Sequence, residues 1–269
     1  MSPLAPGRRA ALVVGTVLSV GLIAIGVLNV VGWMAQSRYQ QELTLRSEVK
    51  VLTVRTGGGD VSVSPSTDDL VHVTESVRYG VTRPTLVHTA TAAGVLLQAG
   101  CGGWWFVGSC SVDYAVAVPG DFVVDVRSGG GSVSAAGLAG SVRLESGGGD
   151  VRASELAGRV ELETGGGSVR GNALRGTAVT ARTGGGNVDL VFAGLPDQVV
   201  AESGGGDVTV AVPGGAAYRV SATSGGGRTS IGVRTDPGAA RSIEARSGGG
   251  DVQVVPTGGA PVAETGSNR

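Results

Sequence analysis

The sequence predicts an all-β protein in which short strands stack into a β-solenoid, and three observations support this fold class. First, Ser or Thr followed by three glycines occurs eight times in the 269 residues. Second, from the second copy onward the starting points are 18, 18, 19, 20, 21 and 23 residues apart, and a period near 20 residues is typical of a solenoid. Third, apolar and polar residues alternate on both sides of each triplet, which is typical of half-buried strands.

The apolar positions change phase at each triplet. Around the triplet that starts at Gly147, Val142 and Leu144 precede it at odd offsets, whereas Val151 and Ala153 follow it at even offsets. One straight strand cannot bury both pairs on the same face, because a shift of one residue turns every side chain to the opposite side. We therefore expect each triplet to be a corner that joins two strands of one rung, with about 18–23 residues per rung.

Glycine suits such a corner because it tolerates a positive φ and the close approach of a neighbouring backbone. Rungs that stack about 4.8 Å apart place every corner against the next one. At Gly148 and Gly166, which are middle glycines, we expect a positive φ or a close contact with the adjacent rung. The glycines that we assign to structural corners are Gly57, Gly129, Gly148, Gly166, Gly185, Gly205, Gly226 and Gly249.

The N-terminal region predicts a membrane anchor. Residues 10–35 contain no charged side chain, and 26 residues are enough to cross a bilayer with some tilt. Arg8 and Arg9 precede this span, so residues 1–9 are expected in the cytoplasm and the rest of the chain outside. A cleaved signal peptide is the alternative, although Trp33 stands where a small residue is expected near the cleavage site. Residues 36–46 are assigned to a juxtamembrane linker.

The remaining chain divides at the repeats. Residues 47–63 form the first rung, and residues 123–255 form the other repeats of the solenoid. Residues 64–122 alternate like strands but lack the triplet, so they are either degenerate rungs or an inserted antiparallel lobe. Residues 256–269 are predicted to be a disordered tail.

Two local features stand out in the segment 64–122. Cys101 and Cys110 are the only cysteines, and a close pair on the oxidising side of a membrane predicts a disulfide that closes a hairpin. Trp104, Trp105 and Phe106 lie between them. These aromatic residues either cover an end of the solenoid or contact a partner, a glycan or the bilayer.

The composition and motifs argue against several classes of function. The net charge is −1 and no basic stripe is present, which argues against nucleic-acid binding. No triplet is followed by the Lys-Ser/Thr of a phosphate-binding loop. Asp follows four of the triplets, but Arg228 occupies the same position in another, and an arginine is a poor neighbour for calcium. Glu161 and Glu163 lie on an outward strand face rather than as a catalytic pair. We therefore expect no enzyme activity, no cofactor and no metal site.

The repeated "SGGGDV" and "TGGGSV" segments, the N-terminal span and the segment "VPGDFVVDV" resemble a known family. They are similar to the actinobacterial putative-adhesin family of β-strand repeat proteins, whose function is unknown. The resemblance covers roughly residues 47–255 and implies an extracytoplasmic β-solenoid. It carries no catalytic residues.

These observations favour a non-enzymatic envelope protein that is anchored in the plasma membrane by a single span. Its solenoid would serve as an adhesion or interaction surface for an envelope protein or a glycan. The alternative is a structural protein that assembles through its solenoid ends into a bactofilin-like polymer, because open edge strands can pair with other copies. A β-helix enzyme that processes glycans is a third, weaker interpretation. Homo-oligomers are compatible with the first two.

Overall fold

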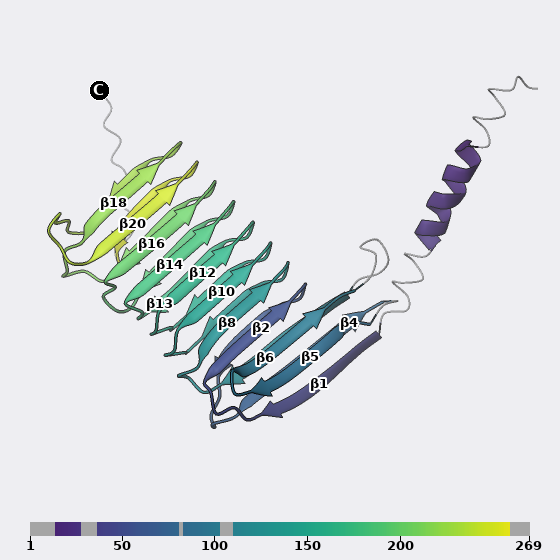
Figure 1. Ribbon diagram of the computed structural model, residues 1–269. Helices are drawn as coiled ribbons and strands as arrows, with labels where there is room; N and C mark the ends of the chain where they lie inside the picture. The colour runs from purple at the N-terminus through teal and green to yellow at the C-terminus, as the bar shows by residue number, and fades with distance from the viewer. Residues whose placement is uncertain (1–13, 28–36, 81–82, 103–109, 259–269) are drawn as a thin grey trace, which may run out of the picture.

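The computed structural model describes residues 14–27, 37–80, 83–102 and 110–258. The strands form two long sheets that face each other along the whole stack (Figure 1). We call them sheet A, with 11 strands, and sheet B, with 10 strands. The all-β prediction is therefore confirmed, and the two stacked sheets are consistent with the predicted β-solenoid.

Sheet A contains the strands that follow the triplets, together with three strands near the N-terminus. In spatial order they are β1 (Ser37–Leu45), β4 (Val71–Tyr79), β7 (Cys110–Val118), β3 (Val61–Pro65), β9 (Val133–Ala136), β11 (Val151–Ser154), β13 (Val169–Leu174), β15 (Val188–Phe192), β17 (Val208–Val212), β21 (Val252–Pro256) and β19 (Thr229–Ile231).

Sheet B contains the strands that precede the triplets, together with β5 and β6, which precede none. In spatial order they are β18 (Arg219–Ser224), β20 (Ser242–Ser247), β16 (Gln198–Ser203), β14 (Ala178–Thr183), β12 (Val160–Thr164), β10 (Val142–Ser146), β8 (Val123–Ser128), β2 (Val51–Thr56), β6 (Gly94–Gly100) and β5 (Thr85–Thr91).

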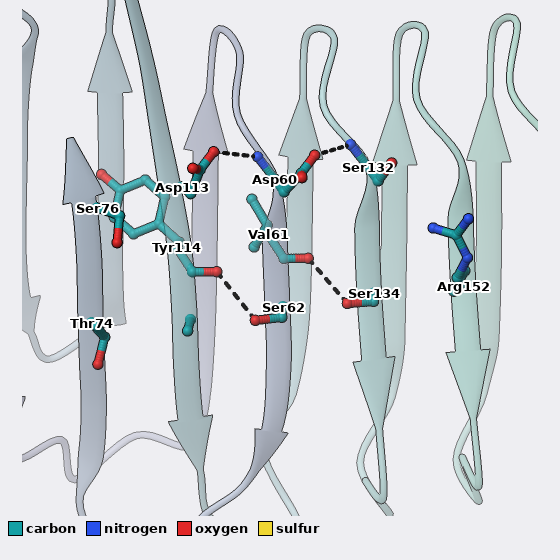
Figure 2. A pocket seen from close by; sticks show the side chains of 11 residues that line it. Asp60, Val61, Ser62, Thr74, Ser76, Asp113, Tyr114, Ser132, Ser134 and Arg152 are labelled. Carbon is teal, nitrogen blue, oxygen red and sulfur yellow. Dashed lines mark hydrogen bonds between the residues drawn. The ribbon is translucent and has the colours of Figure 1, made fainter. Parts of the chain in front are cut away.

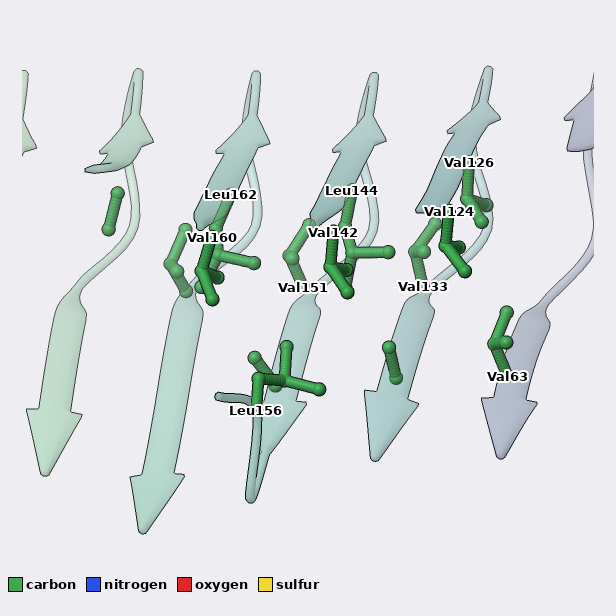
Figure 3. Packing of buried hydrophobic residues seen from close by; sticks show 14 of the residues in the cluster. Val63, Val124, Val126, Val133, Val142, Leu144, Val151, Leu156, Val160 and Leu162 are labelled. Atoms are coloured by element: carbon green, nitrogen blue, oxygen red, sulfur yellow. The ribbon is translucent and has the colours of Figure 1, made fainter. Parts of the chain in front are cut away.

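The core lies between the two sheets and is built from columns of equivalent residues (Figure 3). Leu144 of β10 is paired in register with Val126 of β8 on one side and Leu162 of β12 on the other, and all three side chains are fully buried. The change of phase at the triplet has a simple cause. The chain crosses from sheet B to sheet A there, so the side that faces the core is reset.

The triplets are tight because glycines of neighbouring rungs lie against each other. A Cβ on Gly149, the third glycine of its triplet, would lie 2.4 Å from the carbonyl carbon and oxygen of Gly131 in the next rung. Real Cβ atoms do not approach backbone so closely. A Cβ on the middle glycine, Gly148, would lie 3.9 Å from Gly130 O, which is an ordinary contact.

This geometry corrects the expectation for the middle glycines. Among the described residues, the only triplet glycine with a positive φ is Gly59, at 114°. Among the assigned corner glycines, the distance from an added Cβ to the nearest atom at the middle positions is 3.9 Å at Gly148 and Gly166, 3.8 Å at Gly185, 3.6 Å at Gly205, 3.2 Å at Gly249 and 3.1 Å at Gly226. The other two assigned glycines are first glycines of their triplets: the distance is 2.5 Å at Gly129, and nothing lies within 4 Å at Gly57. The close approach occurs mainly at the first and third glycines, whose Cα hydrogens point along the stack.

The Ser or Thr before each triplet is part of the corner, a role that the sequence analysis missed. Ser146 is 2% exposed; its hydroxyl donates to Gly131 O at 2.8 Å and accepts a hydrogen bond from Gly149 N at 2.9 Å. The hydroxyls before the later triplets make the same two kinds of bond, as at Thr164, whereas the Thr56 hydroxyl bonds only to Gly58 of its own triplet. Except at Thr56, the hydroxyl thus joins two rungs and satisfies a buried backbone group in each.

A second corner lies on the other side of each rung. In three successive rungs it contains a fully buried leucine, namely Leu138, Leu156 and Leu174. The residue before this leucine has a left-handed backbone: φ is 66° at Gly137, 53° at Glu155 and 50° at Ala173. A side chain is unfavourable in this conformation, and only the first of the three rungs uses glycine there.

We expect Glu155→Gly to raise the free energy of unfolding by about 0.5 to 1 kcal/mol, because removing the Cβ relieves the left-handed strain and this exceeds the entropic cost of glycine. The matched control is Ala157→Gly, an exposed position in the same corner with no positive φ. The control should lose about 0.5 to 1 kcal/mol. Urea melts measure both variants, and a loss of stability in Glu155→Gly would contradict the strain.

The last two repeats do not stack in sequence order. β20 and β21 pair with β16 and β17, while β18 and β19 lie outside them at the end of the stack (Figure 1). The chain therefore passes over one rung position, forms the terminal rung, and returns to fill the gap. The inner side of the terminal rung is incompletely covered, because Ile231 is 44% exposed.

The segment 64–122 contains both of the alternatives that the sequence left open. β6 pairs in parallel with β2 and β7 pairs in parallel with β3, so β6 and β7 form a rung without a glycine triplet. β4 and β5 run antiparallel to their neighbours and extend the sheets beyond this rung. β1 pairs with β4, so most of the predicted linker 36–46 is a strand.

The described part of the N-terminal region is a helix at 14–27. No helix among the described residues is long and apolar enough to cross a membrane. The predicted transmembrane helix at 10–35 also includes residues outside those described. At the other end, β21 finishes at Pro256, and residues 259–269 of the predicted tail lie outside the described residues.

Candidate binding surface

A shallow groove crosses the outer face of sheet A near the N-terminal end of the stack (Figure 2). Its volume is about 320 Å³, at the lower end of the range for ligand sites. The floor consists of short side chains on four neighbouring strands, and charged residues lie along the rim. The lining residues are Asp60, Val61, Ser62, Thr74, Ser76, Asp113, Tyr114, Ala115, Ser132, Ser134 and Arg152.

The groove follows from strand alternation. Ser62 and Ser134 are at outward positions of β3 and β9, between residues such as Val61 and Val133 that fill the core. Because several adjacent outward side chains are short, the sheet surface is hollowed there. The two serine hydroxyls make long hydrogen bonds of 3.4 Å to backbone carbonyls of the neighbouring strands. They can therefore exchange these bonds for bonds to a ligand.

The two carboxylates at the rim are fixed by backbone groups. Asp113 Oδ1 accepts the N–H of Asp60 at 3.0 Å, and its Oδ2 accepts a hydrogen bond from Arg78 at 2.5 Å. Asp60 Oδ1 accepts the N–H of Ser132 at 2.8 Å. Each carboxylate is thus held at a defined position before any ligand arrives, which lowers the ordering cost of binding.

The groove continues over β1 and β4. A second hollow, of about 410 Å³, is lined by residues that include Arg38, Gln40 and Arg78. Ser76 and Asp113 line both hollows. The two hollows therefore lie side by side on the outer face of sheet A.

Aspartates that follow the triplets accept hydrogen bonds from backbone N–H groups of a neighbouring rung. Asp150 Oδ1 accepts the N–H of Ser168 at 2.9 Å, and the same arrangement recurs between Asp207 and Asp251 at 2.8 Å. The bond from Ser168 lowers the pKa of the Asp150 carboxyl, and Arg152 adds to this effect. In the described part of the chain, no group of three or more His, Cys, Asp or Glu side chains could hold a metal ion.

The chain matches one known protein family over most of its length. The model of the family Toastrack DUF4097 matches residues 39–255. The chain belongs to the Toastrack DUF4097 family. The match runs from β1 to β21 and therefore spans the irregular segment with the groove.

Solved structures similar to this Toastrack domain have low sequence identity to it. A putative cell adhesion protein from Clostridium sporogenes is 14% identical, with 82% of this chain and 100% of the other covered and a TM-score of 0.38. A putative adhesin from Bacteroides fragilis is 13% identical, with coverage of 82% and 97% and a TM-score of 0.48. A search of curated proteins found no match. The family match confirms the expected relationship to β-repeat proteins at this level, and the actinobacterial origin stays a prediction.

The predicted disulfide of the Toastrack domain is present. Cys101 and Cys110 are bonded, with their Cα atoms 5.9 Å apart. The bond joins the end of β6 to the start of β7, which is the position of the glycine triplet in the other rungs. Trp104, Trp105 and Phe106 lie outside the described residues, so their proposed contact with a partner stays a prediction.

We expect no free thiol at Cys101 or Cys110 in the protein purified without reductant. Reduction should lower the free energy of unfolding by about 2 to 3 kcal/mol, because the bond closes a short loop and limits the unfolded chain. Alkylation followed by mass spectrometry measures the first result, and melts with and without reductant measure the second. Labelling of both cysteines without reductant would contradict the prediction.

The groove could not be predicted from the sequence. The short polar residues at outward strand positions were visible, but residues 64–122 lack the repeat that fixes register. Which outward residues become neighbours depends on the pairing of β4 and β7 with β3.

A buried polar cluster lies behind the groove, on the inner side of the same strands. Glu75 of β4 is fully buried, and its Oε1 is 2.5 Å from Nε2 of His88 on β5. Tyr114 of β7 also faces this carboxyl. Neither Glu75 Oε1 nor His88 Nε2 reaches hydrogen-bond geometry in this arrangement. Burial raises the pKa of the Glu75 carboxyl, and His88 and Tyr114 oppose part of that rise.

The raised pKa of Glu75 predicts a pH-dependent stability. The folded protein favours the protonated Glu75 carboxyl. The stability that this carboxyl contributes is therefore fully present below its pKa in the unfolded chain, and it is lost as the pH rises through its raised pKa in the folded protein. We expect the melting temperature of Glu75→Gln to rise relative to the wild type as the pH increases above the ordinary glutamate pKa of about 4.3. Thermal melts across this range measure it, and a constant difference between the two proteins would contradict the effect of burial.

Proposed function

We propose that this Toastrack protein is a non-enzymatic, membrane-anchored envelope protein that displays its solenoid as an adhesion or interaction surface. The observation that carries the proposal is the polar groove on sheet A. It combines hydroxyls, fixed carboxylates and arginines on paired strands, which is the chemistry of recognition by hydrogen bonds. An envelope protein or a glycan presents matching donors and acceptors.

The state of the carboxylates supports binding rather than catalysis. Asp113 is engaged by Arg78 and by a backbone N–H, and Asp60 is engaged by the next rung. Groups held in this way accept hydrogen bonds well, but general acid–base catalysis needs a group whose proton can move toward the substrate.

The anchor is proposed from the sequence. The uncharged span at 10–35, with Arg8 and Arg9 before it, favours a single pass through the plasma membrane with the Toastrack domain outside. An uncleaved anchor requires that the mature protein keeps residues 1–35, which N-terminal sequencing tests. A mature start near Gln36 or Ser37 would overturn the anchored form.

The groove is tested by filling it. Ser134→Tyr places a large side chain on its floor, and Thr180→Tyr places the same side chain on the outer face of sheet B as a control. Cells that display either variant are compared with the wild type for adhesion to immobilised envelope material. The proposal expects at least a several-fold loss for Ser134→Tyr alone. Equal adhesion of all three proteins would overturn the groove as the contact surface.

Assembly through the solenoid ends is the alternative, and the two ends do not favour it. At the C-terminal end, β18 and β19 belong to a parallel rung. At the other end, β5 runs antiparallel to sheet B. A head-to-tail contact would therefore require an antiparallel pairing of β18 with β5 and a parallel pairing of β19 with β1 at the same junction.

A further inference from the structure

One end of the antiparallel strands must lie close to the end of the apolar span. The span finishes at residue 35, and β1 begins at Ser37. In the β1–β4 pair, Ser37 is opposite Tyr79 and Arg38 is opposite Arg78. Directly opposite residues of antiparallel strands are about 4.5 to 5.5 Å apart at Cα. Chain connectivity alone therefore keeps this strand end within a few residues of the span.

Arginine and tyrosine side chains gather at this end, and we call them the arginine–tyrosine edge: Arg38, Tyr39, Arg78, Tyr79 and Arg83. The rings of Tyr39 and Tyr79 are in edge-to-face contact, with centroids 6.3 Å apart. The Arg83 guanidinium lies 5.8 Å from the centre of the Tyr79 ring. Tyr39 is 42% exposed, and the side chains of Arg38 and Arg83 are exposed.

The charge arrangement of this edge is unfavourable for the isolated domain. Arg38 and Arg78 are directly opposite each other, and like charges in this position destabilise a strand pair. Asp113 compensates Arg78 through the ion pair described above. The edge therefore carries three guanidinium groups against one paired carboxylate. A layer of negative charge next to the edge would offset the repulsion.

We propose that the arginine–tyrosine edge binds anionic lipid headgroups of the membrane that holds the span. This inference rests on the anchored form proposed above. Guanidinium groups pair with phosphate oxygens through two parallel hydrogen bonds, and tyrosine is favoured at the boundary between headgroups and acyl chains. A basic residue near an anionic membrane surface contributes about 1 kcal/mol. The edge would thus fix the orientation of the Toastrack domain on the bilayer rather than leave it to swing on a tether.

The disulfide lies at the same end of the strands, because Cys110 is opposite Tyr79 in the β4–β7 pair. The bond ties the start of β7, the strand next to β4, to the end of β6 in the other sheet. A rigid edge keeps its guanidinium groups in place without ordering at the moment of contact, which favours binding to a surface.

The test uses the full chain in lipid nanodiscs. One set contains phosphatidylcholine alone, and the other contains phosphatidylcholine mixed with phosphatidylglycerol. A water-soluble arylglyoxal modifies arginines, and mass spectrometry follows each residue. Arg228 is the internal control, because its side chain is 75% exposed and it lies on the terminal rung at the far end of the stack.

We expect Arg38 and Arg83 to react several-fold more slowly in the anionic nanodiscs than in the neutral ones, with Arg228 unchanged. Raising the salt concentration should remove most of the difference, because salt screens exposed charges. Equal rates at Arg38 and Arg83 in both lipids would overturn the proposal. So would an equal slowing at all three arginines, which would show a general effect of the lipid on the reagent.

Failure of the anchor gives a separate result. Before the nanodiscs are assembled, membranes that contain the chain are washed at alkaline pH, which removes proteins held only at the surface. Release of the chain by this wash would overturn the anchored form. Retention of the chain together with equal arginine rates would overturn the headgroup contact alone.

Discussion

Gly149→Val is expected to lower the free energy of unfolding by about 3 to 5 kcal/mol. A Cβ at this position would lie 2.4 Å from the carbonyl of Gly131 and 2.6 Å from Ser132 N. Both neighbours are backbone, so no side-chain rotation can relieve the contact. The two rungs would have to separate, which would also stretch the hydrogen bonds made by the Ser146 hydroxyl.

Gly148→Ala is the matched control for this prediction. It changes the adjacent glycine, where the nearest atom to a Cβ is 3.9 Å away and φ is not left-handed. The unfolded chain also loses flexibility, so the control should be neutral or stabilised by about 0.4 to 1 kcal/mol. Thermal or urea melts of the two variants compare them directly. If Gly149→Val melts with the control, the close contact between third glycines does not limit the fold.

Leu144→Ala is expected to lower the free energy of unfolding by about 2 to 5 kcal/mol. Leu144 is fully buried between Val126 and Leu162, in the column that continues through sheet B. The rungs above and below are held by paired strands, so they cannot collapse into the cavity. The loss should therefore lie toward the upper part of this range.

Glu145→Ala tests the opposite side of the same strand. The Glu145 side chain is 40% exposed and lies 3.4 Å from Arg127 in an ion pair. Exposed pairs of this kind contribute about 1 kcal/mol or less. A loss for Glu145→Ala as large as that for Leu144→Ala would mean that the inward and outward assignments on β10 are wrong.

The alternation of residues was enough to tell which side chains of the repeats face the core. The offsets around each triplet placed Val142, Leu144, Val151 and Ala153 inside, and all four are buried. This inference works because alternation along a strand is a local property, and because the repeat shows the same offsets several times. The disulfide was also visible, because only two cysteines exist and they lie close together in the chain.

Local spacing does not determine which parts of the chain become neighbours. One example is the position of β20 and β21, which lie between β16/β17 and the terminal rung β18/β19 although they come last in the chain. The local sequence of a rung is the same whether the rung stacks in chain order or out of it. The pairing of β4 and β7 with the solenoid, which creates the groove, is another.

The glycine corner was determined partly by the sequence and partly by the tertiary structure. The repeat predicted that a triplet is needed, but all three glycines look alike in the sequence. Only the stacking of rungs shows that the Cα hydrogens of Gly147 and Gly149 point at the neighbouring backbone while that of Gly148 points away from it. This difference arises from tertiary packing, because the clash that excludes a side chain is with atoms 18 residues away in the chain.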